Sequence, residues 1–548
     1  MNKRLLMFLI LIVAIIYFTG LSAAEPKFRI VRHPSSPPRA VKGEVPSIPG
    51  KLSQTVKLTP AQRRLLSPQA DLLIYGPASP ISREQILKLR ESRPGQPVGS
   101  IMGTKKKAVN DRAYWNENLY GTLTTQSEVS SAVFGSHVVA GWNDFETWLS
   151  SNSIANWAVS HDGGKTFTDS LTGLPTYAAP GVTSTGGDPG VDVGPDGTFY
   201  YSTLCVYTDD LANDFSGICV YSSADNGDTF DLLTYINTAD TNDFLDKPYL
   251  GVDKTNGTVY VTFTYFDDVS PFYTIYAWNV TALPTGIASN DDGLQGSIPA
   301  VGGDGALYVT YESWDASLNP YIKITKSTDS GASFGSEVNV YGPFVGAADL
   351  TLFGPSFFCG RDAIKGNIRS QEFPSLAVDT RTSGAGAGNL YIAFNARDSV
   401  SNVLDNYLTR STDGGATWST PIRANPRNAA DESDKFFPWV AVNGKGNVGV
   451  IYYERKKTPG VSGPSNNNWW ISTNIRRFSP ALGFIDAAKL SPEFPVITNN
   501  DYSAVCYMGE YNSISANRKG AGDDNFFTFW GDNRYGDPDI QFSKVVPQ

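Results

Sequence analysis

The sequence is poor in the residues that mark several common classes of protein. Its 548 residues include 3 histidines and 4 cysteines, so neither a histidine-rich zinc site nor a dense disulfide framework is expected. No histidine follows His161 to complete an α/β-hydrolase triad in its customary order. Beyond residue 24, no apolar run is long enough to cross a bilayer.

Turn-forming and aromatic residues are abundant instead. The chain has 52 glycines and 34 prolines, with 41% hydrophobic and 12% aromatic residues. This composition is typical of a large packed core in which many turns join short strands. An all-β fold is therefore expected.

The first 24 residues form a predicted secretory signal. Lys3 and Arg4 precede an apolar run from Leu5 to Phe18, and small residues lead up to Ala24. We expect cleavage after Ala24, a secreted, periplasmic or cell-envelope location, and no transmembrane domain in the mature chain. An uncleaved membrane anchor is the alternative, because the run borders on the minimum spanning length.

Charge divides the mature chain into two parts. Residues 25–112 carry 17 basic and 6 acidic side chains, whereas residues 113–548 carry 25 basic and 48 acidic ones. The basic part is proline-rich and is predicted to be an extended leader or linker. It either contacts the acidic body, an envelope surface or an envelope protein, or remains a solvated linker. The acidic body argues against nucleic-acid binding.

The cysteines suggest two disulfides in an exported chain. Cys205 and Cys219 flank the polar stretch YTDDLANDFSG, which predicts a bridge across a hairpin. Cys359 and Cys506 would then pair across a long loop. Four buried thiols are the alternative.

One octapeptide pattern, S-x-D-x-G-x-x-[FW], occurs four times, which makes it specific. The copies are Ser160–Phe167, Ser223–Phe230, Ser327–Phe334 and Ser411–Trp418. In a tight turn the aspartate accepts backbone hydrogen bonds, the glycine allows a positive φ, and the aromatic residue packs inward. The aspartates are therefore predicted to shape hairpin turns and not to catalyse; they are Asp162, Asp225, Asp329 and Asp413.

A second repeat, P-x-[ILV]-x-V-[DN], precedes a glycine-containing turn and an alternating strand. These alternating strands are the second strands of the predicted blades. They centre on Trp142, Leu204, Tyr265, Tyr311, Asn395, Tyr453 and Trp530. They predict an all-β, seven-bladed β-propeller over residues 113–548, with six blades as the alternative because the spacing is uneven. Closure of the ring then requires an outer strand from a segment before Ser127.

The topology of such a blade predicts a functional face. The octets mark the turn between the third and fourth strands, so the residues that end each second strand lie on the opposite face near the axis. Residues just before each first strand lie there too. The second-strand candidates are Arg397, Glu454, Arg455 and Arg534. The arginines either bind a ligand carboxylate in bidentate pairs or pair with an aspartate of a neighbouring blade.

Acidic residues precede several first strands. If Asp188, Asp246 and Asp434 face the channel mouth, their like charges require a cation or a proton. Hard oxygen ligands suit Ca²⁺, which makes these three a candidate metal site. Capping of turns is the alternative role.

The octets resemble the Asp boxes (BNR repeats) of the sialidase-like superfamily, and the resemblance extends over roughly Ser127 to Lys544. It implies three arginines that hold a substrate carboxylate, a tyrosine nucleophile activated by a glutamate, and an aspartate acid/base. A neutral phenol avoids the repulsion that an anionic nucleophile would feel beside a carboxylated sugar.

Several residues match these roles by their order along the chain. They are Glu372, Arg397, Arg455 and one of Tyr502 or Tyr507. The Arg-Ile-Pro motif of the family is missing, because the similar string from Phe28 to Val31 lacks the proline and lies in the leader. This departure puts sialidase activity itself in doubt.

Two classes of function follow from these patterns. The first is a glycan-active propeller, either a divergent glycoside hydrolase or a carbohydrate-binding protein, whose ligand is a glycan or another anionic molecule. The alternative is a non-catalytic envelope scaffold that binds protein partners. Fold resemblance alone does not decide between them.

Overall fold

The computed structural model describes most of the predicted body of the chain. The described residues are 28–32, 113–116, 126–267, 273–291, 293–348, 363–365, 368–428, 431–457, 469–495, 507–517, 523–532 and 538–546. The predicted signal and most of the basic leader lie outside them. So do Cys359, Cys506, Tyr502 and Arg534.

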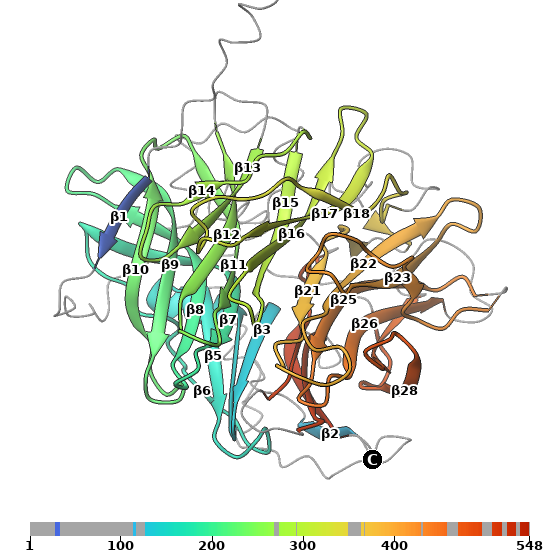
Figure 1. Cartoon of the computed structure of the whole chain (residues 1–548). Coiled ribbons are helices and arrows are strands. Elements are labelled where there is room, and N and C mark those ends of the chain that lie inside the picture. The colour runs from blue at the N-terminus through green and yellow to red at the C-terminus, as the bar shows by residue number, and fades with distance from the viewer. Residues whose placement is uncertain are drawn as a thin grey trace, which may run out of the picture.

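The described chain is a β-propeller in which successive strands form antiparallel four-stranded meanders (Figure 1). The first meanders are β3 (Gln126–Phe134), β4 (His137–Asp144), β5 (Ala155–Ser160) and β6 (Thr168–Asp169); β7 (Gly181–Val193), β8 (Phe199–Thr208), β9 (Asp214–Ser223) and β10 (Asp231–Thr238); and β11 (Phe244–Val252), β12 (Val259–Phe266), β13 (Tyr273–Asn279) and β14 (Thr285–Gly286).

Further meanders follow in the same pattern. They are β15 (Gly293–Val301), β16 (Leu307–Trp314), β17 (Pro320–Ser327) and β18 (Val338–Tyr341); β21 (Ser375–Val378), β22 (Leu390–Asp398), β23 (Val403–Ser411) and β24 (Ile422–Arg423); and β25 (Asp434–Val442), β26 (Val448–Lys457), β27 (Trp469–Phe478) and β28 (Phe484–Lys489), with β29 (Phe494–Pro495) also on β27. A short helix, α5 (Phe145–Ser151), and a small hairpin, β19 (Ala363–Ile364) and β20 (Ile368–Arg369), lie between meanders.

The last meander joins the two ends of the described body. Strands β30 (Ser513–Ser515), β31 (Phe526–Asp532) and β32 (Asp539–Val545) pair in order, and β2 (Ala113–Asn116) pairs with β32 as the outer strand. In Figure 1 the blue β2 lies beside the red C-terminal strands. The outer strand thus comes from a segment before Ser127, as ring closure requires.

The first strands of the meanders surround a common axis. They contact one another in the order β3, β7, β11, β15, β21, β25 and β30, and β30 contacts β3. Each sheet therefore packs between two neighbours. A strand such as β12 is therefore buried along its whole length. Its sequence, VYVTFTYF, does not alternate between apolar and charged residues, because neither of its faces is exposed to solvent.

The leader adds a fifth strand to one sheet. Strand β1 (Phe28–Arg32) pairs with the outer strand β10, at the left edge of Figure 1. The ring of Phe28 packs edge-on against Phe263, Tyr265 and Tyr276 of the next sheet, with ring centroids 5.2–5.9 Å apart. The string that resembles the family's first-blade motif is therefore on the periphery, away from the axis.

All four octets, called Asp boxes below, connect a third strand to a fourth strand. In the last of them, Ser411 and the backbone N–H of Thr417 donate to Asp413 Oδ1 at 2.7 and 2.9 Å. The backbone N–H of Gly415, whose φ is 86°, donates to Ser411 Oγ at 2.9 Å. The Thr417 hydroxyl also donates to Asp413 and lowers its pKa most. Together with the Thr417 backbone N–H and the Ser411 hydroxyl, it brings the pKa of Asp413 to about 2.

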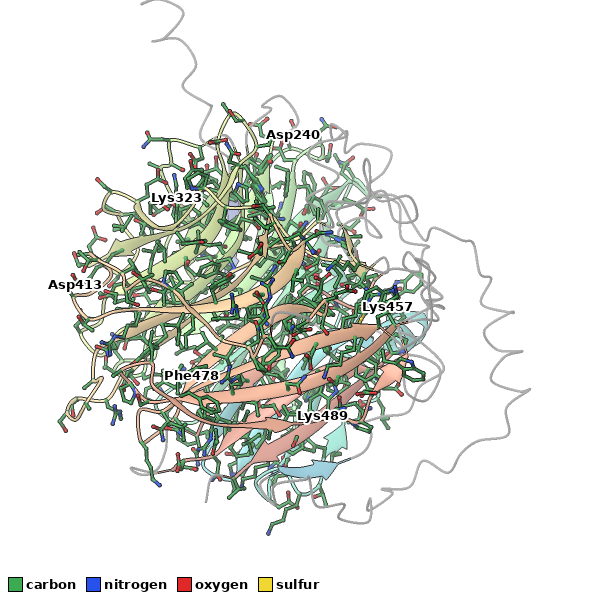
Figure 2. All side chains as sticks on the ribbon, turned by 90° about the vertical axis from the view of Figure 1, so that its right-hand side faces the viewer. Asp240, Lys323, Asp413, Lys457, Phe478 and Lys489 are labelled. Atoms are coloured by element: carbon green, nitrogen blue, oxygen red, sulfur yellow. A yellow bond between two sulfur atoms is a disulfide. The ribbon has the colours of Figure 1, made fainter. Side chains whose placement is uncertain are left out.

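The Asp boxes also hold neighbouring sheets together. The aromatic residue of the first box, Phe167, packs on Phe542 of the last meander at 5.0 Å between ring centroids. In the second box, the carbonyl of Gly227 accepts a hydrogen bond from Trp157 Nε1 of the preceding sheet at 2.9 Å. Figure 2 shows Asp413 at one side of the molecule and Lys457, which ends the second strand β26, toward the other.

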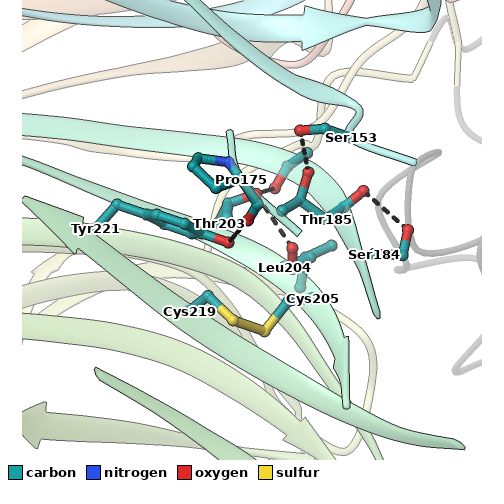
Figure 3. The surroundings of a disulfide bond; sticks show 10 residues. Ser153, Pro175, Ser184, Thr185, Thr203, Leu204, Cys205, Cys219 and Tyr221 are labelled. Carbon is teal, nitrogen blue, oxygen red and sulfur yellow. Dashed lines mark hydrogen bonds between the residues drawn. A yellow bond between two sulfur atoms is a disulfide. The ribbon is translucent and has the colours of Figure 1, made fainter. Parts of the chain in front are cut away.

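Cys205 and Cys219 are joined by a disulfide between β8 and β9, with 5.9 Å between their Cα atoms (Figure 3). The bridge closes the hairpin that carries the polar stretch predicted from the sequence. Beside it, the Tyr221 hydroxyl donates to the carbonyl of Pro175 at 2.8 Å. Among the described residues, no helix is long and apolar enough to cross a membrane.

Replacing Asp413 with asparagine is expected to lower the melting temperature by a few degrees at pH 7, because the amide accepts the turn's hydrogen bonds less strongly than the carboxylate. The pKa of Asp413 is lower in the folded than in the unfolded protein. Its stabilisation is therefore present above about pH 4 and is lost as the pH falls toward 2.

Thermal melts at pH 7, 4 and 2.5 test this expectation. The matched control is Thr412→Ala, which changes an exposed residue of the same turn and is expected to leave the melting temperature within a degree or so of wild type. If the difference in melting temperature between Asp413→Asn and wild type stays the same as the pH is lowered, the expectation is contradicted.

Candidate functional site

The face opposite the Asp boxes is built on a bulge that recurs in the first strands. The pairing register shifts at Glu128, Asp188, Lys247, Gly296 and Phe437, and each of these residues has a φ between 48° and 64°. Such backbone is unfavourable for a residue with a side chain, by about 1–3 kcal/mol, and is found mainly at functional sites. The bulges bring side chains of different sheets together at the axis.

Lys247 is the centre of the resulting axial ion cluster, which consists of Glu128, Asp188, Lys247, Arg369 and Glu510. The Lys247 ammonium lies 3.1 Å from Glu128 Oε1 and 3.7 Å from Asp188 Oδ2, and it also pairs with Glu510. Arg369 Nη2 lies 2.5 Å from Glu510 Oε1. All five side chains are at most 5% exposed.

Two carboxyl groups of the axial ion cluster have pKa values that are shifted in opposite directions. Burial alone would raise the pKa of Glu128, but the Lys247 charge and the hydrogen bonds that Glu128 accepts lower it below the ordinary value. Burial, reinforced by the neighbouring Glu128 charge, raises the pKa of Asp188 well above its ordinary value despite Lys247. The proton is therefore held more strongly by Asp188 than by Glu128.

The same charges keep the lysine protonated. Burial would lower the pKa of Lys247, but Glu128 and Glu510 raise it above its ordinary value. Lys247 and Arg369 thus supply two basic side chains to the buried acids of the axial ion cluster.

A tyrosine predicted from the sequence joins this arrangement. Tyr507 is 1% exposed, and its side chain hydrogen-bonds the Glu128 carboxylate. Asn143 connects the two acids, because its Nδ2 donates to Glu128 Oε2 at 3.0 Å while its Oδ1 accepts from the backbone N–H of Asp188 at 2.8 Å. The structure thus places a phenol, a carboxyl group of lowered pKa and a carboxyl group of raised pKa in one hydrogen-bonded set.

Aromatic rings form the floor beneath Lys247. Tyr249, Trp439 and Tyr511 come from three different first-strand segments, and their ring centroids are 5.5–6.0 Å apart. The Lys247 ammonium lies 5.6 Å from the Tyr511 ring and 5.5 Å from the Phe373 ring. Tyr249 and Trp439 also line the central channel, of about 120 Å³, which runs between the first strands.

The predicted arginines do not meet at this point. Arg397 is buried and donates from Nη1 to Asp434 Oδ1 of the next sheet at 3.1 Å, and from Nε to the carbonyl of Ala347 at 3.0 Å. The guanidinium of Arg455 lies over the Trp469 ring at 5.1 Å. Arg397 therefore has the inter-blade pairing that the sequence left open as the alternative to ligand binding.

The predicted acids have separate surroundings. Glu372 accepts a hydrogen bond from the backbone N–H of Ala347. Glu454 pairs with Lys456 at 3.0 Å and borders an open groove of about 690 Å³, which is lined by Pro426, Arg427, Asn428, Asp431, Glu432, Ser433, Glu454, Lys456 and Lys457.

The three candidate metal ligands also have partners of their own. Asp188 lies beside Lys247, Asp246 Oδ2 accepts from Gln295 Nε2 at 3.1 Å, and Asp434 pairs with Arg397. Within the ranges that the structure describes, no three histidine, cysteine or acidic side chains gather as a metal-binding group. The donor set therefore does not fit a Ca²⁺ ion held by these three aspartates.

Sequence reasoning missed four members of the axial ion cluster as site residues: Glu128, Lys247, Arg369 and Glu510. Lys247 directly precedes Pro248, just as Asp188 precedes Pro189, so alignment of the first-strand repeat would have found it. Glu128 and Glu510 precede no proline, and only the fold shows that their strands occupy equivalent places.

Comparisons with known proteins give weak likenesses. No protein-family model matches the chain, and no curated protein does. Solved structures that are similar include a protein of unknown function from Dyadobacter fermentans, at 12% identity over 80% of this chain and 99% of that one, with a TM-score of 0.40.

Two glycosidases are also similar in structure. The α-L-arabinofuranosidase Arb93A from Fusarium graminearum has 13% identity over 80% of this chain and 98% of its own, with a TM-score of 0.39. The Trypanosoma rangeli sialidase has 12% identity over 69% and 56%, with a TM-score of 0.33. Because identity and TM-score are both low, we draw nothing from these likenesses about the chemistry of this chain.

The decisive observation is that all four octets lie at the same turn of a four-stranded sheet in a propeller. The chain resembles the sialidase-like Asp-box propellers. In this Asp-box propeller, Glu128, Asp188 and Lys247 of the axial ion cluster lie at first-strand bulges.

Replacing Lys247 with methionine is expected to lower the free energy of unfolding by about 3–5 kcal/mol, because Glu128 and Glu510 would remain buried without the ammonium. Urea unfolding at pH 7, followed by tryptophan fluorescence, measures the change.

The control for this experiment is Lys445→Met. Lys445 pairs with Asp524 at 3.0 Å but is 53% exposed, so its loss is expected to cost less than about 1 kcal/mol. If the two substitutions lower the free energy of unfolding equally, then Lys247 does not stabilise the buried acids of the axial ion cluster.

Proposed function

We propose that this protein is an exported, seven-bladed Asp-box propeller that binds or hydrolyses glycans on the face opposite its Asp boxes. Support for export comes from the predicted signal sequence and from the disulfide between Cys205 and Cys219. The axial chemistry favours a neutral glycan over an anionic one.

Support for seven blades comes from the order of contacts. The meanders that begin with β3, β7, β11, β15, β21, β25 and β30 each contribute one strand to the ring of first strands. The strand β2 completes the meander that contains β32. A six-bladed ring would leave one of these sheets without a place.

The observation that carries the proposed activity is the hydrogen-bonded set of Tyr507, Glu128 and Asp188. Glycoside hydrolysis needs a proton donor for the leaving oxygen and a second group that attacks the sugar or activates the attacking group. The raised pKa of Asp188 favours its protonated form, which can donate a proton. Glu128 is ionised and can take the proton of the Tyr507 hydroxyl, which makes that oxygen a nucleophile.

The surroundings of these groups favour a neutral sugar over a carboxylated one. Arg369 is already paired with Glu510, and Arg397 with Asp434. Recognition of a carboxylate by arginine would require those pairs to open, at the cost of leaving buried acids without a partner. A neutral glycan needs no such rearrangement.

Turnover of a panel of fluorogenic glycosides, including arabinosides and sialosides, tests this function together with binding to a glycan array. Tyr507→Phe and Asp188→Asn are each expected to lower kcat by about 10²–10⁴-fold. Tyr200→Phe is the control, because Tyr200 is a half-buried tyrosine away from the axial ion cluster.

Each variant is compared with wild type by circular dichroism and thermal melting, so that loss of fold is recognised. A wild-type protein with neither turnover nor glycan binding would remove this proposal. Equal losses in Tyr200→Phe and Tyr507→Phe would remove the role of Tyr507.

The pairing of Arg397 with Asp434 favours a second candidate function, a non-catalytic envelope scaffold. In that case the buried charges serve only to hold the blades in register. Binding of envelope proteins that depends on residues 25–112, in a wild-type chain that ignores every glycan tested, would favour the scaffold over the glycan-active propeller.

A further inference from the structure

Two of the chain's 3 histidines face each other on the Asp-box side of the molecule. His137 begins β4, directly after the first turn of its sheet, and His161 is the second residue of the first Asp box. Their Nδ1 atoms are 2.9 Å apart. The rings meet edge to face, with centroids 5.1 Å apart and planes at 73°.

A carboxylate orients one of these rings. His161 Nε2 lies 2.8 Å from Asp228 Oδ1, which belongs to the second Asp box on the neighbouring sheet. Because a carboxylate accepts but does not donate, Nε2 of His161 carries the hydrogen. In the neutral ring, the lone pair of Nδ1 then points toward His137.

We propose that His137 and His161 bind a divalent late transition-metal ion of the Zn²⁺ and Cu²⁺ class through their Nδ1 atoms. Imidazole nitrogen suits these ions. A carboxylate on the far nitrogen of a ligating histidine is the common arrangement that fixes its tautomer and raises its basicity. The His161–Asp228 contact has that form.

The site has two protein ligands. Two nitrogen ligands leave further coordination positions, which water would fill. The His161 side chain is 44% exposed and that of Asp228 is 56% exposed, which leaves room for solvent ligands.

Binding requires one change of tautomer. Without metal, the hydrogen between the two Nδ1 atoms belongs to His137, since the Nδ1 of neutral His161 is the acceptor. On binding, that proton leaves His137 Nδ1 and His137 takes up a proton from water at Nε2. With metal–nitrogen bonds of about 2.0–2.1 Å, the cation lies to one side of the line that joins the two Nδ1 atoms, and no net proton is released.

Titration of the mature chain without a polyhistidine tag tests the proposal. Zn²⁺ binding is measured by calorimetry, and Cu²⁺ coordination by electron paramagnetic resonance. We expect one saturable site per chain with two nitrogen ligands, at least 10-fold weaker Zn²⁺ binding in His137→Ala and His161→Ala, and about 10-fold weaker binding in Asp228→Asn.

His33→Ala is the matched control, because His33 is the third histidine of the sequence, and it is expected to bind as the wild type does. His161→Gln replaces His161→Ala if thermal melting without metal shows that the alanine variant is unfolded. The absence of a saturable site at one equivalent, unchanged binding in both His137 and His161 variants, or loss of binding in His33→Ala would each overturn the proposal.

Discussion

Each sheet of this protein has two apolar faces, and the fold depends on burying both of them. A strand such as β12, which is buried along its whole length, is stable only if the sheets on either side of it are present. A ring in which every sheet has two neighbours meets this requirement, and pairing of β2 with β32 completes the last sheet with its outer strand. The Asp boxes reinforce the ring from one side, because their aromatic residues and glycines pack against the preceding sheet.

The same ring concentrates polar groups at its axis. The first strands converge there, and their bulges present Glu128, Asp188 and Lys247 to one another. Like charges in a buried space are tolerated only when they are balanced, which here involves two basic side chains and a raised pKa of Asp188 that favours its protonated form. A structural requirement for neutrality thus produces an acid and a base with separated pKa values, which is also the requirement for proton-transfer chemistry.

The two faces of the molecule have different chemistry for a topological reason. Second-to-third-strand loops and the connections between sheets lie toward the axial ion cluster, whereas the Asp boxes lie on the other side. Glycan binding is proposed for the first face and metal binding for the second. The metal site lies where two Asp boxes of adjacent sheets meet, so the geometry of the boxes positions His161 between His137 and Asp228.

The amino-acid sequence alone determined the all-β class, the turn role of Asp162, Asp225, Asp329 and Asp413, the place of the Asp boxes at the third turn, and the need for an outer strand before Ser127. These features are local, because each depends on hydrogen bonds and side-chain alternation within a few residues. The sequence patterns that produce them therefore recur in every blade that has the feature. Only the tertiary structure decided which charged side chains meet. Arg397 looks equivalent to Arg455 in the sequence, yet it pairs with Asp434, and Glu128 and Glu510 are 382 residues apart but share Lys247. Such contacts depend on ring closure, because it alone brings the first and last sheets to the same axis.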